Sequence, residues 1–160
     1  MYNNRESIQP SPAYFKLITL VHAALLIGQI LFGVVTYSIT NSTGLNLKPG
    51  NDVFFYVALL LTVGGMLMGT FLFKQQVAKL ADKASLREKL TAYQAALIIR
   101  FAFSNGPSMF GIVVYMLTGN LFYMILTTLN VLYFIWIRPT KDKIKEDLSL
   151  TYEEELAMEG

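Results

Sequence analysis

Apolar residues dominate several long stretches of this chain, and charged residues are nearly absent from them. The stretches cover about residues 13–39, 53–73 and 101–137, and the last contains no formally charged side chain. An α-helix rises about 1.5 Å per residue, so about 20 apolar residues are needed to cross the hydrocarbon core of a bilayer. A turn signal at residues 118–120 divides the longest stretch in two. The pattern therefore predicts an all-α integral membrane protein with four transmembrane helices.

Local signals mark the ends of the third and fourth helices. Ser85 and Glu88 have the spacing of a capping box, so the third helix is expected to begin directly after Ser85. Gly119 suits the position after the C-terminus of this helix, and Asn120 can cap the fourth. Pro139 follows the fourth apolar segment and ends it. The four helices are expected to form two hairpins.

Basic residues gather at one end of the predicted bundle. They flank the apolar region and fill the connection between the second and third helices: Arg5, Lys16, Lys74, Lys79, Lys83, Arg87, Lys89, Arg138, Lys141, Lys143 and Lys145. The loop at 40–52 contains only Lys48, and the turn at 118–120 contains no basic residue. Because basic residues are enriched in cytoplasmic loops, both the N and the C terminus are expected in the cytoplasm.

We divide the chain into a transmembrane domain over residues 1–139 and a short cytoplasmic tail over residues 140–160. In the tail, Ile144 and Leu148 are four residues apart among alternating basic and acidic residues. Thr151 and Glu154 repeat the spacing of a capping box. The pattern is typical of an amphipathic, acidic tail that is solvated or lies on a surface. A segment that docks on a partner protein is the alternative.

Composition supports a membrane environment. Hydrophobic residues make up 54% of the 160 residues and charged residues 15%, against about 25% charged residues in soluble domains. The chain has no cysteine, which excludes disulfides and thiolate metal sites. A net charge of +2 is too small to predict a nucleic-acid partner.

Small residues in the first two predicted helices indicate close packing. Gly65 and Gly69 form a GxxxG pair in the second helix, and Gly28 and Gly33 offer small surfaces on the first. Such residues let two helix backbones approach closely in lipid. We expect the first helix to pack on the second. Self-association, or docking on another membrane subunit, is the alternative.

Arg100 and a helix breaker lie at the start of the longest apolar stretch. Counting about 20 residues back from the turn at 118–120 places Arg100 at the inner boundary of the hydrocarbon, where its long side chain can reach the headgroups. A buried role in binding an anionic lipid headgroup or a partner subunit is the alternative. Gly106 and Pro107 predict a kink in the third helix, because proline cannot donate to the carbonyl four residues earlier.

Polar residues form a stripe on the first predicted helix. His22, Gln29 and Thr36 recur every seven residues and share one face. At 1.5 Å per residue, His22 lies at a depth similar to that of Asn105 and Asn130, so these three could meet in the inner third of the bundle. Hydrogen bonds that fix helix packing are the first interpretation of this cluster. A pocket for a lipid or quinone-type molecule is the second.

The sequence contains no candidate residues for several kinds of chemistry. No carboxylate lies within a predicted span, whereas ion-coupled transporters generally need an ionisable acid at membrane depth. No nucleophile–base set, metal-ligand spacing or glycine-rich phosphate loop is present. We therefore expect no enzymatic activity, no metal and no cofactor. The single histidine cannot supply both ligands of a bis-histidine haem.

Two resemblances bear on the family of the chain. Residues 98–113, IIRFAFSNGPSMFGIV, resemble the acid-bearing helix of the proteolipid subunits of rotary ATPases. The ion-binding carboxylate of that family has no counterpart, since Asn105 is the nearest polar residue, and a rotor role is rejected. As a whole, the chain is similar to uncharacterised small four-span inner-membrane proteins of Bacteroidota-like bacteria. This likeness implies a multi-pass location in a bacterial inner (cytoplasmic) membrane.

The leading hypothesis is a non-catalytic integral membrane protein that serves as an accessory or stabilising subunit of a larger inner-membrane complex. Its expected partners are the lipid bilayer and other membrane subunits or further copies of itself. The first alternative is an oligomeric channel or facilitator lined by the polar stripe of the first helix. The second is a lipid- or quinone-binding membrane protein that uses Arg100 and the polar cluster.

Overall fold

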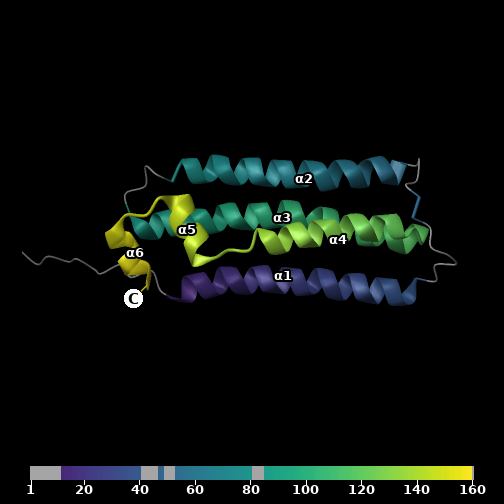
Figure 1. Cartoon of the computed structure of the whole chain (residues 1–160), viewed down its shortest axis with the longest axis horizontal. Coiled ribbons are helices and arrows are strands. Elements are labelled where there is room, and N and C mark those ends of the chain that lie inside the picture. The colour runs from purple at the N-terminus through teal and green to yellow at the C-terminus, as the bar shows by residue number, and fades with distance from the viewer. Residues whose placement is uncertain (1–11, 41–46, 49–52, 81–84, 160) are drawn as a thin grey trace, which may run out of the picture.

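The computed structural model describes residues 12–40, 47–48, 53–80 and 85–159, and over these ranges every secondary-structure element is a helix, with no strand. The helices are α1 (Pro12–Ile39), α2 (Val53–Ala78), α3 (Leu86–Thr118), α4 (Leu121–Trp136), α5 (Lys141–Leu148) and α6 (Tyr152–Glu159). The four long helices lie side by side along one axis (Figure 1). Arg5 and Lys83, which contributed to the predicted orientation, lie outside the described residues.

Three of these helices, α1, α2 and α3, are long and apolar enough to cross a membrane. With 16 residues, α4 extends about 24 Å, less than the usual 30 Å of hydrocarbon. It is followed by α5 at an angle of 75° across a short break, and α4 with α5 counts as a fourth candidate only if such a bent pair is one span. The all-α fold is therefore confirmed, and the fourth crossing stays a prediction.

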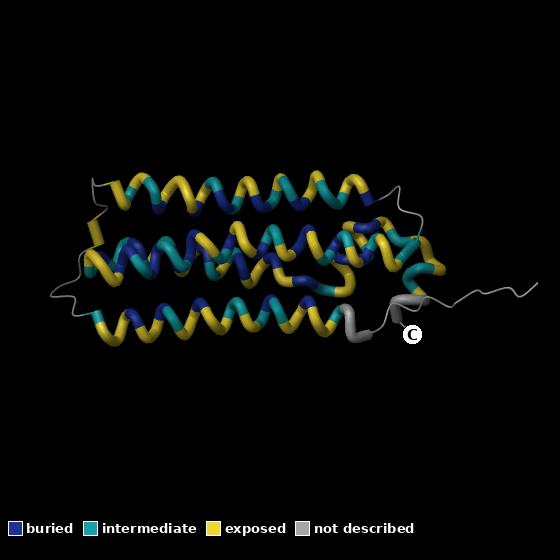
Figure 2. Tube along the Cα trace, turned by 180° about the vertical axis from the view of Figure 1, so that it is seen from behind, coloured by how far each residue is buried: buried dark blue, intermediate teal, exposed yellow. Residues whose placement is uncertain are grey.

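Apolar side chains cover much of the outside of the bundle, whereas several polar ones are inside it. Leu60 and Leu67 on α2 are 71% and 68% exposed, while Gln29 and Asn130 are each 1% exposed. Exposed positions follow the outer sides of α1 and α2, and buried positions face the middle of the bundle (Figure 2). A soluble protein rarely exposes apolar surface on this scale. The distribution is consistent with a multi-pass membrane protein whose outer faces contact lipid.

The predicted helix ends agree with the structure. Ser85 caps α3 by accepting a hydrogen bond from the backbone N–H of Glu88 at 3.3 Å. Gly119 takes the left-handed conformation after α3, with φ at 65°, and Asn120 caps α4 by accepting from the N–H of Phe122 at 3.0 Å. The Asn120 amide also donates to the carbonyl of Lys48 at 3.0 Å, which ties this turn to the segment that precedes α2.

The prediction that the first helix packs on the second is wrong. Over the described residues, α2 packs chiefly on α3, and α1 packs on α3 and α4 from the opposite side (Figure 1). A Cβ added to Gly69 would lie 3.0 Å from the Cβ of Phe103, whereas one added to Gly28 would meet no atom within 4 Å. Gly33 is only in ordinary contact with α3 and α4. A GxxxG pair defines a surface open to close approach, and it does not identify the helix that approaches.

The kink expected at Gly106 and Pro107 stays a prediction, and α3 runs without interruption through Pro107. Proline leaves the carbonyl of Phe103 without its usual helical partner. This carbonyl oxygen lies only 2.6 Å from where a Cβ of Gly65 would be, and Cγ of Pro107 lies 2.9 Å from the same point. The glycine surface of α2 is therefore fitted to the part of α3 that the proline alters. Gly106 has open space around it.

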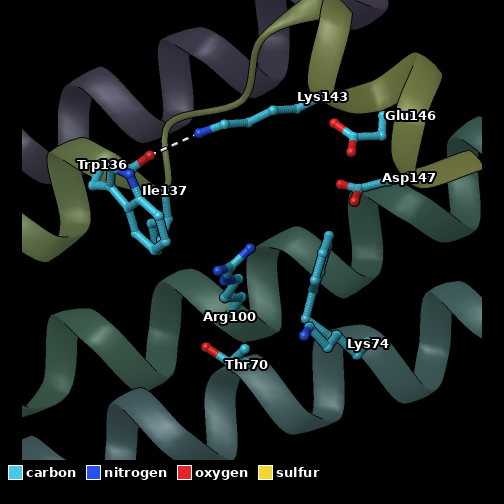
Figure 3. Close-up of a pocket in the computed structure, with 9 residues that line it drawn as sticks. Thr70, Lys74, Arg100, Trp136, Ile137, Lys143, Glu146 and Asp147 are labelled. Atoms are coloured by element: carbon cyan, nitrogen blue, oxygen red, sulfur yellow. Dashed lines mark hydrogen bonds between the residues drawn. The ribbon is translucent and has the colours of Figure 1, made fainter.

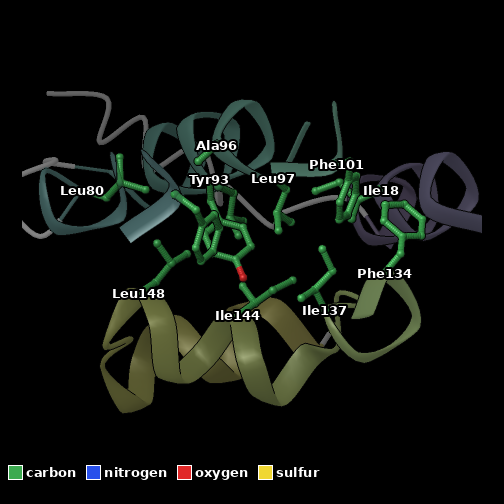
Figure 4. Packing of buried hydrophobic residues seen from close by; sticks show 12 residues of the cluster. Ile18, Leu80, Tyr93, Ala96, Leu97, Phe101, Phe134, Ile137, Ile144 and Leu148 are labelled. Carbon is green, nitrogen blue, oxygen red and sulfur yellow. The ribbon is translucent and has the colours of Figure 1, made fainter. Parts of the chain in front are cut away.

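The chain turns sharply between α4 and α5, and we call residues 137–140 the elbow and this end of the bundle the elbow end. Ile144 and Leu148 of α5 are buried against Tyr93 and Leu97 of α3, in one apolar cluster (Figure 4). The first part of the predicted tail thus belongs to the packed core. The spacing of four residues between Ile144 and Leu148 is the pattern that produces this buried face.

Ion pairs attach the last helix, α6, to α3 and to α5. Lys89 donates to Glu154 at 2.8 Å, and Lys145 pairs with Glu155 at 3.6 Å. The predicted second capping box is present, because the N–H of Thr151 donates to the Glu154 carboxylate at 3.0 Å and Thr151 accepts from the N–H of Glu154. The hydrogen bond from Lys89 is the main reason that the pKa of the Glu154 carboxyl lies below its usual value.

Candidate functional site

A pocket of about 260 Å³, lined by both charged and apolar side chains, lies at the elbow end between α2, α3 and α5, and we call it the Arg100 pocket. Five of its lining residues are charged. They come from three helices, and the complete lining is Thr70, Phe73, Lys74, Arg100, Trp136, Ile137, Lys143, Glu146 and Asp147. Figure 3 shows Arg100 and Lys74 on one side of the space and the two acids of α5 on the other.

Arg100 is held in place by an aromatic ring. Its guanidinium carbon lies 4.8 Å from the centre of the Phe73 ring, a cation–π contact between α3 and α2. The Nε atom of Arg100 is buried and has no hydrogen-bond partner in the described part of the chain. Arg100 also forms no salt bridge there. The two predicted roles of Arg100, contact with headgroups and a buried binding role, stay predictions.

Lys143 and Asp147 are fixed on the α5 side of the pocket. The ammonium of Lys143 donates to the carbonyl of Trp136 at 2.7 Å and to that of Arg138 at 3.3 Å (Figure 3). One carboxylate oxygen of Asp147 accepts from the hydroxyl of Tyr93 at 2.7 Å. Because Tyr93 is 1% exposed, it is a rigid anchor for this acid. The pocket is therefore partly built before any ligand arrives.

His22 is part of a packed aromatic layer. Its ring stacks on Phe134, with centroids 4.4 Å apart, and meets Phe101 edge-on at 5.1 Å. Its Nε2–H donates to the carbonyl oxygen of Phe134 at 2.9 Å. His22 also borders a second cavity of about 420 Å³ between α1 and the elbow, which Arg138 and Lys141 line from the other side.

The predicted cluster of His22, Asn105 and Asn130 does not form as one hydrogen-bonded group. Asn130 donates to the carbonyl of Ser104 at 2.9 Å, while His22 bonds one turn away at Phe134. The carboxamide oxygen of Asn105 is buried and has no partner among the described residues. His22 and Asn130 do lie at similar depths along the bundle, as the residue count predicts. Depth alone, however, does not say toward which neighbouring helix a side chain points.

Contacts between α1 and α3 define a constant register. His22 meets Phe101, a Cβ on Gly33 would meet Ile112, and Tyr37 stacks near Tyr115. Each pair differs by 78 or 79 positions, so the two helices run parallel with a fixed offset. This offset places Gln29, which carries two unpaired polar atoms, at the level of Ser108 on α3.

The same level contains further polar groups. Thr127 of α4 donates to the carbonyl of Ser108 at 3.4 Å, and the hydroxyl of Ser108 has no partner in the described structure. Gln29, Ser108 and Thr127 are 1%, 0% and 6% exposed. The polar stripe of α1 therefore faces α3 and α4 inside a single chain.

Sequence reasoning identified Arg100 but missed the rest of its pocket. Lys74, Lys143, Glu146 and Asp147 were counted only as flanking charges, since they lie far from Arg100 in sequence. The available signal was the Ile144–Leu148 pair, which predicts that α5 lies on the bundle and brings its charged residues with it. Among the described residues, no group of three or more His, Cys, Asp or Glu side chains is placed to hold a metal ion.

Comparisons with known protein families, with characterised proteins and with solved structures give no match to this chain.

Proposed function

We propose that this chain is a non-catalytic, multi-pass protein of a bacterial inner membrane that binds a phospholipid through the Arg100 pocket. The observation that carries the proposal is an arginine at the rim of an apolar bundle with no anionic partner in the described chain, beside a cavity bordered by two lysines. An arginine guanidinium matches a phosphate group with paired N–H donors. A phosphate in this pocket would give Arg100 the partner that the protein does not supply.

The level of the pocket supports a headgroup as the ligand. The inner end of α4 borders the pocket through Trp136, which is 71% exposed, and tryptophan is enriched at the headgroup level of membranes. Lys74, at the same end, is a basic residue of the kind found on the cytoplasmic side. The acyl chains would lie along the exposed apolar face of α2. A quinone has no anionic group, so it would leave these cations without a partner.

The oligomeric channel receives less support. A path lined by the α1 stripe would need His22, Gln29 and Thr36 on an outer face, where further copies could meet. They are 6%, 1% and 1% exposed in a single chain, and the register directs them toward α3 and α4.

Native mass spectrometry of the detergent-purified protein tests the phospholipid proposal. Arg100→Gln is expected to reduce the retained phospholipid roughly tenfold, the effect of one or two charge-assisted hydrogen bonds. Arg87→Gln is the matched control, because Arg87 is an exposed arginine in the same helix, away from the pocket. Equal phospholipid retention by the wild type and both variants would contradict the proposal, as would retention of a quinone in place of the phospholipid.

An accessory subunit is the second candidate, and one surface favours it. Ala24 and Gly28 are exposed on the outer side of α1, and no atom lies within 4 Å of a Cβ added to Gly28. This small-residue surface has no helix packed on it in the described chain, so another transmembrane helix could approach it closely.

Purification in mild detergent tests this second candidate. Gly28→Leu is expected to remove a co-purifying membrane subunit, whereas Gly64→Leu, at a second glycine with open surroundings on α2, is expected to retain it. A wild-type chain that is recovered alone and monodisperse would count against the accessory role.

A further inference from the structure

We infer that the Arg100 pocket selects among phospholipids, and that it takes a headgroup with a primary ammonium as well as a phosphate. This inference rests on the proposed function, because it names the class of lipid for the same site. Two acids, Glu146 and Asp147, also line the pocket, and a phosphate would not pair with them.

Opposite charges face each other across the pocket without pairing. Arg100 and Lys74 lie on one side, and Glu146 and Asp147 lie on the other (Figure 3). In the described chain, no salt bridge within 4.0 Å joins either acid to a lysine or arginine. Elsewhere at this end of the bundle such pairs do form, as between Lys89 and Glu154. The pocket therefore holds Arg100 and Lys74 apart from the two acids, with a cavity between them. Lys143 lies on the side of the acids, where its ammonium donates to the carbonyls of Trp136 and Arg138.

One charged residue on each side of the pocket is held by an aromatic residue. The ring of Phe73 lies under the Arg100 guanidinium, and the Tyr93 hydroxyl donates to one oxygen of Asp147. A carboxylate has about four acceptor positions on its two oxygens, so the Tyr93 bond leaves capacity for another donor.

A zwitterionic headgroup satisfies both sides together. Its phosphate would accept from Arg100 and Lys74, and its primary ammonium would donate to Glu146 and Asp147, with three N–H groups available. A headgroup with a phosphate and no amine would place its negative charge near two carboxylates. A quaternary ammonium has no N–H to donate. The expected order of preference is phosphoethanolamine, then phosphocholine, then phosphoglycerol.

The size of the cavity agrees with a headgroup of this kind. Its volume of about 260 Å³ is slightly below the range of about 300–1,000 Å³ that is typical of pockets for whole small molecules. It can contain a compact polar headgroup and leaves the acyl chains outside, against the lipid-facing surface.

Competition between three phospholipids with identical acyl chains tests the inference. Equimolar phosphatidylethanolamine, phosphatidylcholine and phosphatidylglycerol are added to the delipidated full chain, and the bound lipid is identified by native mass spectrometry. The wild type is expected to retain phosphatidylethanolamine over phosphatidylglycerol by roughly tenfold, as one charge-assisted hydrogen bond would give. Glu146→Gln is expected to reduce this ratio toward one while total phospholipid binding persists.

Two further variants distinguish a failure of the lipid-selectivity inference from a failure of the proposed phospholipid binding. Glu153→Gln, at an exposed acid of α6 away from the pocket, is expected to keep the wild-type ratio. Arg100→Gln is expected to reduce retention of all three lipids. Lipid retention that depends on Arg100 without a preference for phosphatidylethanolamine would overturn the inference and leave the proposed function standing. Retention that is unaffected by Arg100→Gln would overturn both.

Discussion

Gln29 presents the sharpest conflict between a residue and its surroundings. It is 1% exposed, and in the described chain neither its amide nitrogen nor its carbonyl oxygen has a hydrogen-bond partner. A buried polar group without a partner costs about 1–3 kcal/mol. Asn130 is equally buried, and its carboxamide oxygen also has no partner in the described chain, but its amide nitrogen donates to the Ser104 carbonyl. The two amides therefore differ by one interhelical hydrogen bond.

Replacing each amide by leucine separates these contributions. Gln29→Leu is expected to raise the free energy of unfolding by about 1 kcal/mol, since it removes an unpaired polar group and keeps a similar volume. Asn130→Leu also removes an unpaired oxygen but loses an interhelical hydrogen bond, so it is expected to be less stabilising than Gln29→Leu by about 0.6 kcal/mol, the usual value of such a bond in a membrane. Thermal unfolding in detergent, followed by the fluorescence of the single tryptophan Trp136, measures both. A larger loss for Gln29→Leu than for Asn130→Leu would mean that Gln29 has a partner.

At the scale of helices, the α2–α3 contact combines two unusual features of the sequence. Pro107 removes a helical hydrogen bond and leaves the Phe103 carbonyl oxygen on the surface of α3, where Gly65 lies against it. The absence of a Cβ at Gly65 permits this approach, and a Cα–H donor there can partly replace the lost bond. Each feature alone would weaken a helix, but together they form an interface.

Two adjacent glycines of α2 provide a matched test of this interface. Gly65→Ala is expected to destabilise the protein by about 1–3 kcal/mol, because the new methyl would lie 2.6 Å from the Phe103 carbonyl oxygen. Gly64→Ala is expected to be neutral or stabilising, because its methyl meets nothing within 4 Å. Chemical denaturation in mixed micelles compares the two variants. Equal effects would show that α2 does not contact α3 at Gly65.

The attachment of α6 is expected to depend on pH. The hydrogen bond from Lys89 depresses the pKa of Glu154, so the ion pair stabilises the docked helix above the pKa of an unpaired glutamate and is lost as the pH falls through the lower, folded value. The pair contributes about 0.2–1 kcal/mol, as partly exposed pairs do. An NMR titration of the Glu154 carboxyl carbon measures this pKa. Lys89→Gln is expected to raise it, and an unchanged pKa would show that the pair does not form.

Over the whole molecule, the features that could be predicted are those that depend on residues close together in the sequence. The ends of α3 and α4 follow from Ser85, Gly119 and Asn120, whose caps act within a few residues. The Arg100 pocket was only partly predictable, because its charges come from helices distant in sequence and meet through the fold of α5. The partner of Gly65 was also not predictable, since a small surface is compatible with any helix that can reach it.

The path of α4 decides the arrangement of the whole chain. Its 16 residues are short for a span, and in Figure 1 it begins at the end of the bundle near the α3–α4 turn and stops short of the other end, which the elbow and α5 complete. At one end the Asn120 amide bonds to the Lys48 carbonyl, and at the other end α5 packs on the part of α3 that follows Ser85. If α1, α2 and α3 cross the membrane, α4 must return through it, with local thinning of the bilayer to match its length.

Because the chain contains no cysteine, single cysteines can report this topology without background. Leu47→Cys and Thr118→Cys are expected to react with a membrane-impermeant maleimide in intact cells, since both residues are exposed at the end of the bundle opposite the elbow end. Arg87→Cys and Glu153→Cys, exposed at the elbow end, are expected to react only after permeabilisation. Labelling of Thr118→Cys and Glu153→Cys from the same side would mean that α4 does not cross. The elbow, and with it the Arg100 pocket, would then not lie at the cytoplasmic headgroups.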